Sequence, residues 1–256
     1  MTWNPEQYLS FGDHRTRPAI DLLARIVLRA PVRIADLGCG PGNSTALLVE
    51  RWPDAAVTGI DSSAAMLAKA RASDIRANWL QADIADWTPA LPFELLFSNA
   101  ALHWLPGHAE LLPRLFAQVV PGGVLAVQMP HNFSAPSHVL LHELAAAQPW
   151  AGRLETALLR EPVGSPAWYY DLLAPCAADL DIWETEYLHV LDGDDPVLAW
   201  NRGTVLRPVR AALEPDELAA FEADYARRLR AAYPRRPDGR TLFPFRRLFI
   251  VACRSD

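Results

Sequence analysis

Three closely spaced glycines, Gly38, Gly40 and Gly42, form the stretch of this sequence best suited to bind a ligand. A strand pattern precedes them at residues 32–35, and a helical pattern follows at residues 45–52. Glycine has no Cβ and tolerates positive φ, so a ligand can approach the backbone closely at such a turn. The helix that follows presents unpaired N–H groups and a positive dipole end. The pattern therefore predicts a nucleotide-type ligand at the end of a parallel strand.

The spacing of the glycines argues against NAD as this ligand. The NAD fingerprint Gly-x-Gly-x-x-Gly requires a glycine at position 43, where this sequence has Asn43. A Tyr-x-x-x-Lys signature for hydride transfer is also missing. Asp36 precedes the glycines, and the resulting Asp-x-Gly-x-Gly-x-Gly pattern resembles motif I of the class I S-adenosylmethionine (SAM) methyltransferases.

Asp61 is the second expected binding residue. It ends a buried strand pattern 25 residues after Asp36. A carboxylate at this position can accept hydrogen bonds from ribose hydroxyls, in NAD folds and SAM folds alike. The alternative role for Asp61 is to begin the next helix as its N-cap. Because the glycine loop is also present, we favour ribose binding.

The resemblance to methyltransferases implies further cofactor contacts. Asp83 follows the third strand pattern, where such enzymes place an acid that accepts from the adenine amino group. Asn99 follows the fourth, in the turn that offers backbone carbonyls to the methionine ammonium. Asp36 is either ionised near that ammonium or orients the glycine loop. The complete expected set is Asp36, Gly38, Cys39, Gly40, Asp61, Ser62, Asp83, Ile84 and Asn99.

The elements around these residues alternate between strands and helices, which predicts an α/β fold. We expect a Rossmann-like, doubly wound, seven-stranded and mostly parallel sheet with a helical lid insertion. The expected strands are 32–35, 56–60, 77–81, 93–98, 122–128, 181–187 and 247–253. The expected helices begin at Pro18 and cover 45–52, 64–71, 108–119, 196–205 and 215–233. We assign residues 1–128 to the SAM-binding core, 129–240 to a lid or substrate region with one late strand, and 241–256 to a final core strand.

The composition argues against some classes of binding partner and indicates a cellular compartment. The net charge of −6 over 256 residues argues against a nucleic-acid partner. No secretory signal is expected, because residues 2–6 have neither a basic start nor an apolar run. No transmembrane segment is expected, because arginines interrupt the apolar stretches near the start. The three cysteines, Cys39, Cys176 and Cys253, are widely spaced, which predicts neither a disulfide framework nor a metal site and fits the cytoplasm. Residues 202–254 carry twelve arginines and six acids, so this stretch is basic.

Several segments outside the glycine loop resemble the bacterial trans-aconitate 2-methyltransferases. They are Trp3-Asn4-Pro5, Arg51-Trp52-Pro53, Gly59-Ile60-Asp61, Tyr169-Tyr170-Asp171, Asp181-Ile182-Trp183 and residues 247–252. The resemblance spans nearly the whole chain. It implies methyl transfer from SAM to a carboxylate of trans-aconitate, a small polycarboxylic acid, with a monomethyl ester and S-adenosylhomocysteine as products. The protein is then expected to be a monomer or a weak homo-oligomer without nucleic-acid or membrane partners.

No general base is expected for such a reaction. A carboxylic acid has a pKa near 4, so the nucleophilic carboxylate already exists at neutral pH. His103 becomes the first candidate base if the acceptor is instead a carbon, nitrogen or phenol nucleophile. Other small acids, and a SAM-binding regulator without turnover, remain alternatives. Aromatic and cationic side chains suit the substrate, and the candidates are Tyr8, Arg17, Trp104, Tyr170, Arg207 and Arg247.

Overall fold

A computed structural model of the chain describes residues 16–158 and 163–255. The chain divides into two compact units. The first unit comprises Met1–Pro130, Val163–Thr185 and Arg247–Asp256, and the second comprises His131–Pro162 and Glu186–Arg246. Tyr8, one of the expected substrate contacts, lies outside the described residues.

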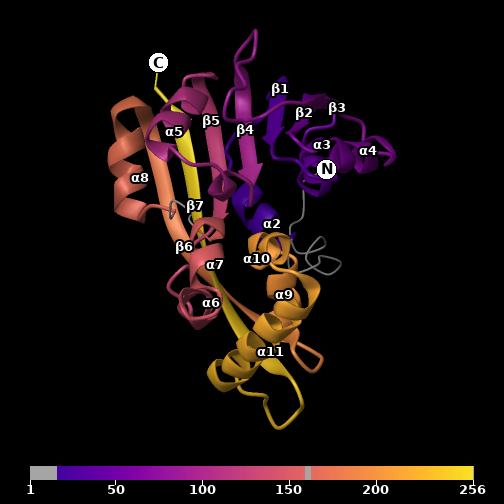
Figure 1. The fold of residues 1–256 in the computed structure, drawn as a ribbon. Coiled ribbons are helices and arrows are strands. Elements are labelled where there is room, and N and C mark those ends of the chain that lie inside the picture. The colour runs from indigo at the N-terminus through magenta and orange to yellow at the C-terminus, as the bar shows by residue number, and fades with distance from the viewer. Residues whose placement is uncertain (1–15, 159–162, 256) are drawn as a thin grey trace. The chain divides into compact units, whose positions relative to one another are not determined.

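A seven-stranded sheet forms the first unit, and its last two strands also contribute residues to the second. The strand order is β3-β2-β1-β4-β5-β7-β6 (Figure 1). The first five strands pair in parallel, whereas β7 runs antiparallel to β5. The strands are β1 (Arg33–Leu37), β2 (Ala56–Asp61), β3 (Asn78–Gln81), β4 (Phe93–Asn99), β5 (Val119–Pro130), β6 (Ala177–Leu191) and β7 (Thr241–Arg254).

The first unit also contains helices, three of which connect consecutive parallel strands. They are α2 (Arg17–Ala24), α3 (Asn43–Arg51), α4 (Ala64–Arg71), α5 (His108–Phe116) and α8 (Pro166–Leu173), with the short 3-10 helices η1 (Leu102–Trp104) and η2 (Ala174–Cys176). From β1 the chain winds outward to β2 and β3, and later from β4 outward to β5. Right-handed crossovers in opposite directions place α3 and α5 on opposite faces of the sheet. The order reverses between β1 and β4, where α/β sheets of this kind bind ligands.

The central strands form because their residues are apolar on both sides. Ile34 and Leu37 in β1 and Leu95, Leu96 and Phe97 in β4 are completely buried. Such continuous apolar runs are typical of parallel strands that are covered by helices on both faces. The fold class that the sequence predicts, a seven-stranded and mostly parallel sheet, is therefore confirmed.

The structure extends three of the predicted strands. β5, β6 and β7 are longer at both ends than their apolar cores at 122–128, 181–187 and 247–253 suggest. An antiparallel ladder from Val124↔Cys253 to Pro130↔Arg247 carries β5 beyond its apolar core. In contrast, α5 ends at Phe116 instead of residue 119, because the chain must already enter β5 at Val119.

Residues 163–185 group with the first unit rather than with the lid region that we expect over 129–240. The contact between α8 and α5 explains this grouping. Tyr169 is fully buried, and its hydroxyl lies 2.6 Å from His108 Nδ1. His108 Nε2 lies 3.0 Å from the Leu102 carbonyl, which can only accept. In the neutral imidazole, His108 therefore carries its proton on Nε2, and Tyr169 donates to Nδ1 while accepting from the Gly164 N–H.

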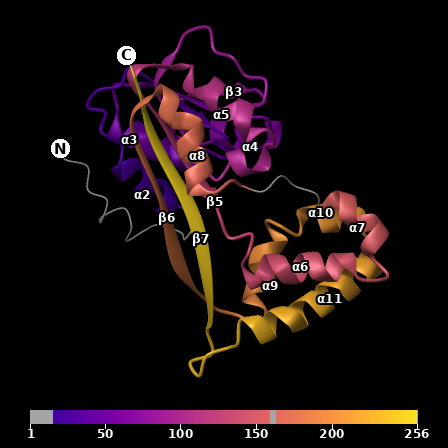
Figure 2. The same cartoon turned by 90° about the vertical axis from the view of Figure 1, so that its left-hand side faces the viewer.

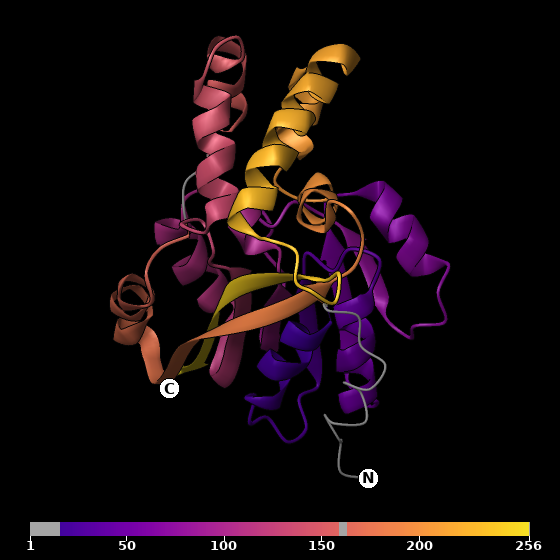
Figure 3. The ribbon, with the colours of Figure 1, turned by 90° about the horizontal axis from the view of Figure 1, so that it is seen from below.

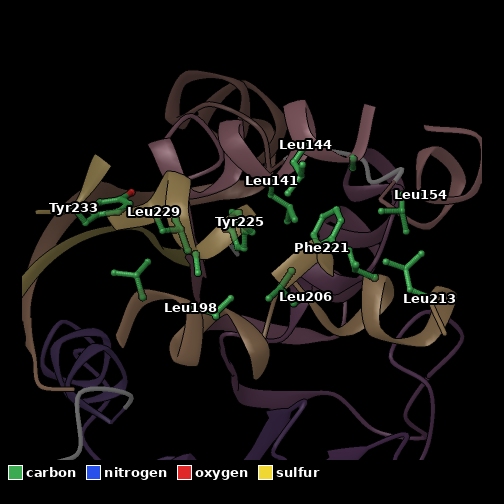
Figure 4. Close-up of a cluster of buried hydrophobic side chains, with 14 of the residues drawn as sticks. Leu141, Leu144, Leu154, Leu198, Leu206, Leu213, Phe221, Tyr225, Leu229 and Tyr233 are labelled. Atoms are coloured by element: carbon green, nitrogen blue, oxygen red, sulfur yellow. The ribbon is translucent and has the colours of Figure 1, made fainter. Parts of the chain in front are cut away.

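The second unit is built from five helices among the residues that the structure describes. They are α6 (Pro136–Ala146), α7 (Ala151–Ala157), α9 (Pro196–Arg202), α10 (Arg207–Ala212) and α11 (Pro215–Ala232). Helices α6 and α11 lie side by side (Figures 2 and 3). Leucines of both helices surround Phe221 and Tyr225 in a separate hydrophobic core (Figure 4). This core gives the second unit its own source of stability.

None of the helices within residues 16–158 and 163–255 is long and apolar enough to span a bilayer.

The His108–Tyr169 contact provides a test of how α8 is attached. Tyr169→Phe leaves the acceptor His108 Nδ1 buried without its donor, which should lower the free energy of unfolding by about 1–3 kcal/mol. Urea unfolding curves measure this change. Tyr170→Phe is the matched control because Tyr170 is 55% exposed and should unfold like the unmodified protein. Equal stability of the two variants would contradict the hydrogen-bond assignment.

Candidate cofactor-binding site

The glycine loop between β1 and α3 has the backbone conformation that its sequence predicts. Gly38, Gly40 and Gly42 all have positive φ, at 74°, 55° and 98°. The N–H groups of Gly38 and Cys39 both donate to the Ile60 carbonyl, at 2.8 and 3.0 Å. The loop is thus fixed to the end of β2. A Cβ added at Gly40 would meet no atom within 4 Å, so the backbone there is open to a ligand.

Gly38 has a different function, which is to let two loops meet. A Cβ at this position would lie 2.2 Å from the Ala101 Cβ, in the loop that follows β4. It would also lie 3.7 Å from Ile84 Cδ1. The loops after β1, β3 and β4 therefore come together where the strand order reverses. The Ser98 hydroxyl adds a buried hydrogen bond of 2.9 Å to the Leu37 carbonyl.

Asp36 is a completely buried carboxylate at the end of β1. Its Oδ2 accepts hydrogen bonds from the hydroxyls of Ser44, at 2.7 Å, and Thr45, at 2.6 Å, in the first turn of α3. Its Oδ1 is also buried and has no hydrogen-bond partner among the described residues. Burial raises the pKa of Asp36 to about 6, although the two hydroxyls act in the opposite direction. The free oxygen leaves room for one more donor or for a cation.

Asp61 holds the turn after β2 with both of its carboxylate oxygens. Oδ2 accepts from the Gly40 N–H at 2.9 Å, and Oδ1 accepts from the Ser63 N–H at 2.8 Å. Each oxygen retains a second lone pair, so ribose hydroxyls can still be bound. The N-cap of α4 is Ser63, whose side chain accepts from Met66 N. The neighbouring Ser62 is exposed.

The remaining expected cofactor contacts differ in exposure. Asp83 is exposed and accepts a hydrogen bond from the Ala85 N–H through Oδ1, whereas the Ile84 side chain is buried. Cys39 is buried beside Gly59, and a Cβ on that glycine would lie 3.0 Å from Sγ. Burial raises the pKa of the Cys39 thiol above its ordinary value, so this cysteine stays protonated and packs as a small apolar side chain.

Asn99 and Ala100 form an unusual turn at the end of β4. Ala100 has φ of 55°, which is rare for a residue with a side chain. The Asn99 Oδ1 atom is buried and has no hydrogen-bond partner among the described residues. Backbone strain and an unsatisfied acceptor together are typical of functional sites.

The expected substrate contacts belong to both units. Trp104 and Tyr170 are exposed, and the Trp104 ring lies 4.9 Å from that of His103. Arg17 is exposed on α2, 4.0 Å from Asp21. Arg207 is exposed on α10 of the second unit.

Arg247 differs from the other expected cations because it is only 5% exposed. Its Nη1 lies 3.3 Å from Oε1 of Gln128, a fully buried residue that our sequence analysis did not select. The Gln128 Nε2 atom has no hydrogen-bond partner among the described residues. Gln128 pairs in register with Asn99, so this cation and amide lie near the β4 turn. The sequence feature that could have identified Gln128 is its position as a polar residue within an apolar strand pattern.

Metal binding receives no support from the described residues. Within residues 16–158 and 163–255, no group of three or more His, Cys, Asp or Glu side chains could hold a metal ion. The three cysteines are all free thiols.

Comparison with known proteins places the chain among methyltransferases. The family model described as "Methyltransferase domain" matches residues 34–123, which include the glycine loop and the β4 turn. A trans-aconitate 2-methyltransferase from Azoarcus sp. (strain BH72) is 54% identical over 253 residues, covering 99% of each chain. The enzymes of the same name from Rhodopseudomonas palustris (strain BisB18) and Streptomyces avermitilis are each 50% identical. They cover 98% of this chain and 98% and 96% of their own.

Solved structures with low sequence identity share the fold. The YcgJ protein from Bacillus subtilis is 14% identical with a TM-score of 0.61, covering 95% of this chain and all of that one. The Haemonchus contortus phosphoethanolamine N-methyltransferase 2, solved with SAM, is 16% identical with a TM-score of 0.56. It covers 93% of this chain and 52% of its own.

The buried Asp36 predicts a specific pH dependence of stability. The native carboxyl holds its proton up to about pH 6, whereas an unfolded aspartate releases it near pH 3.8. The free energy of unfolding should therefore fall as the pH rises from 4 to 6, by up to roughly 3 kcal/mol, and then stay level. Urea unfolding of the ligand-free protein between pH 4.5 and 7.5 measures this contribution. It should disappear in Asp36→Asn and persist in Asp54→Asn, which changes an exposed residue. Parallel curves for all three proteins would contradict the raised pKa.

Proposed function

The chain belongs to the trans-aconitate 2-methyltransferase family, and we propose that it transfers the methyl group of SAM to a carboxylate of trans-aconitate. The products are a monomethyl ester and S-adenosylhomocysteine. The observation that carries this proposal is the 54% identity over 99% of both chains to a relative of that name. Because the identity extends through both units, it includes the parts that select an acceptor as well as the cofactor loop.

The site supports SAM as the cofactor. The open backbone at Gly40 can accommodate a ligand, and Asp61 and Asp83 present carboxylate oxygens to ribose and adenine. Asp36 Oδ1 and Asn99 Oδ1 are buried acceptors without partners among the described residues, which suits the cationic methionine end of SAM. SAM supplies an electrophilic methyl group on a positively charged sulfur.

The acceptor carboxylate needs no activation by a base. Its pKa near 4 leaves it ionised at neutral pH, so the chain has only to orient it and exclude water. The charges of the anionic oxygen and the cationic sulfur cancel as the methyl group moves, and a dry site therefore favours the transition state over the reactants.

Arg247 and Gln128 are the best supported contacts for one acceptor carboxylate. A buried guanidinium and an unpartnered amide N–H can donate together to a carboxylate. We assign them to a carboxylate that is not methylated, because hydrogen bonds from arginine would weaken the nucleophile. Trp104, Tyr170, Arg17 and Arg207 are exposed, and for them substrate contact rests on the sequence alone.

The setting we propose is the cytoplasm, with the protein acting as a monomer or weak homo-oligomer on a small acid. Three free cysteines, of which Cys176 is exposed, support a reducing compartment.

Replacing Asp61 tests the cofactor assignment. Asp61→Ala removes hydrogen bonds to a charged acceptor, worth about 1.5–3 kcal/mol, and should weaken SAM binding roughly 10- to 150-fold. Isothermal titration calorimetry measures the affinity. Asp54→Ala is the matched control, because Asp54 is exposed and should leave SAM binding unchanged. Unchanged affinity in Asp61→Ala would remove ribose binding from the proposal.

Methyl transfer is tested directly with methyl-labelled SAM and trans-aconitate. Mass spectrometry should detect a labelled monomethyl ester and an equal amount of S-adenosylhomocysteine. His103→Ala should retain kcat within about threefold, since loss of a general base would instead cost roughly 100- to 10,000-fold. At saturating SAM, kcat should have the same pH dependence in both proteins.

Two results would change this proposal. Labelling of a different acid in a panel of small carboxylates would redirect the acceptor while leaving the reaction class intact. A large loss in His103→Ala, together with a pH-dependent rate, would indicate a nucleophile that requires deprotonation.

A further inference from the structure

A single hydrogen-bonded turn follows β3 in the first unit and comprises residues 83–87. The Asp83 carbonyl accepts from the N–H groups of Asp86, at 3.2 Å, and Trp87, at 2.9 Å. Asp83 Oδ1 also accepts from the Ala85 N–H at 2.9 Å, so the turn orients this carboxylate. Because the turn does not continue into a helix, its later carbonyls have no helical N–H to accept from.

Arg114, in the last turn of α5, supplies donors to these carbonyls. Its Nη2 donates to the carbonyls of Ile84, at 2.8 Å, and Ala85, at 2.7 Å. Its Nη1 donates to the Trp87 carbonyl at 2.7 Å. A planar guanidinium can reach several acceptors at once, and its positive charge suits the carbonyl end of a turn. Arg114 thus fixes the backbone of the turn from its C-terminal side.

The turn contains two of the expected cofactor contacts, Asp83 and Ile84. The Ile84 side chain is buried, and a Cβ at Gly38 would lie 3.7 Å from its Cδ1. The turn therefore lies beside the glycine loop, whereas the Asp83 side chain is exposed. Water competes for an exposed carboxylate, so its selectivity for one group of a ligand depends on how well its position is fixed.

We propose that Arg114 is a positioning residue for adenine recognition, which holds the turn so that Asp83 meets the adenine amino group. The inference rests on the proposed function for the identity of the cofactor. Arg114 contributes through the backbone of the turn. Its loss should therefore reduce the discrimination between adenine and a purine without the amino group, while Asp61 and the glycine loop continue to bind the rest of the cofactor.

Calorimetry with two ligands tests this role. One is S-adenosylhomocysteine, and the other is its analogue in which hydrogen replaces the adenine amino group. The unmodified protein should bind S-adenosylhomocysteine about 10-fold more tightly than the analogue, at the lower end of the range for a hydrogen bond to a charged group because Asp83 is exposed. Arg114→Ala should reduce this ratio to less than about threefold, by weakening the binding of S-adenosylhomocysteine.

A conservative variant keeps the test independent of folding. Arg114→Lys retains the charge but presents its donors from one nitrogen, so it should give an intermediate ratio. This variant decides the question if Arg114→Ala does not fold.

Arg254→Ala is the matched control. Arg254 Nη1 donates to the carbonyls of Ala117, at 2.8 Å, and Val119, where β5 begins in the same unit. Both alanine substitutions remove charged hydrogen bonds to carbonyls, so urea unfolding should show lower stability in each variant. Only Arg114→Ala should change the ratio of the two affinities.

A double substitution locates the effect at Asp83. Asp83→Ala removes the acceptor and should by itself reduce the ratio to about one. Adding Arg114→Ala to this variant should leave the ratio unchanged, because the two residues act through one contact with the ligand.

The possible outcomes separate this inference from the proposed function. An unchanged ratio in the Arg114 variants, or an equal loss in Arg254→Ala, would overturn the positioning role while SAM binding and methyl transfer stand. A ratio that depends on Arg114 without formation of a methyl ester would support the positioning role and contradict the proposed reaction. Failure of the unmodified protein to bind S-adenosylhomocysteine would overturn both.

Discussion

The missing side chain at Gly38 is the constraint on which the cofactor site depends. The loops after β1 and β4 approach so closely there that a Cβ would lie 2.2 Å from that of Ala101, a separation that packed atoms cannot adopt. A larger residue would push apart the two loops that flank the reversal in strand order. Asp36, Asp61 and Asn99 lie at or next to the carboxyl ends of the three adjacent strands β1, β2 and β4. The site is thus a consequence of strand order and of one backbone position.

The same region contains the buried carboxylate of Asp36, and only one of its two oxygens has hydrogen-bond partners among the described residues. Burying a carboxylate is costly unless hydrogen bonds compensate for the lost water, and Asp36 receives such bonds on Oδ2 alone. The hydroxyls of Ser44 and Thr45 tie this carboxylate to α3, so it also fixes the helix behind the glycine loop. Both roles that the sequence left open for Asp36 are therefore compatible. Oδ2 orients the loop and α3, while Oδ1 stays available for a cation.

The sequence predicts the local features of this protein well, but it does not reveal contacts between residues that are far apart in the chain. Asp36, the glycines and Asp61 could be selected because each stands at the end of a strand pattern, and the fold class follows from the alternation of elements. Gln128 acquires its significance only through Arg247, which is 119 positions away. The grouping of α8 with the first unit likewise depends on a contact between Tyr169 and His108 that no local pattern reveals. Strand ends were missed for the same reason, since ladder pairing extends β5 beyond its apolar core.

Burial separates the arginines of the basic stretch by function. Most of those near α11 form exposed ion pairs, such as Arg230 with Asp195 and Arg202 with Glu222, which contribute little to stability or recognition. Arg247 is instead buried against an amide, where water cannot compete for its hydrogen bonds. A guanidinium in such surroundings is well placed to bind a carboxylate through charge-assisted hydrogen bonds. The net charge of the stretch therefore says little about anion binding, which depends on the surroundings of each arginine.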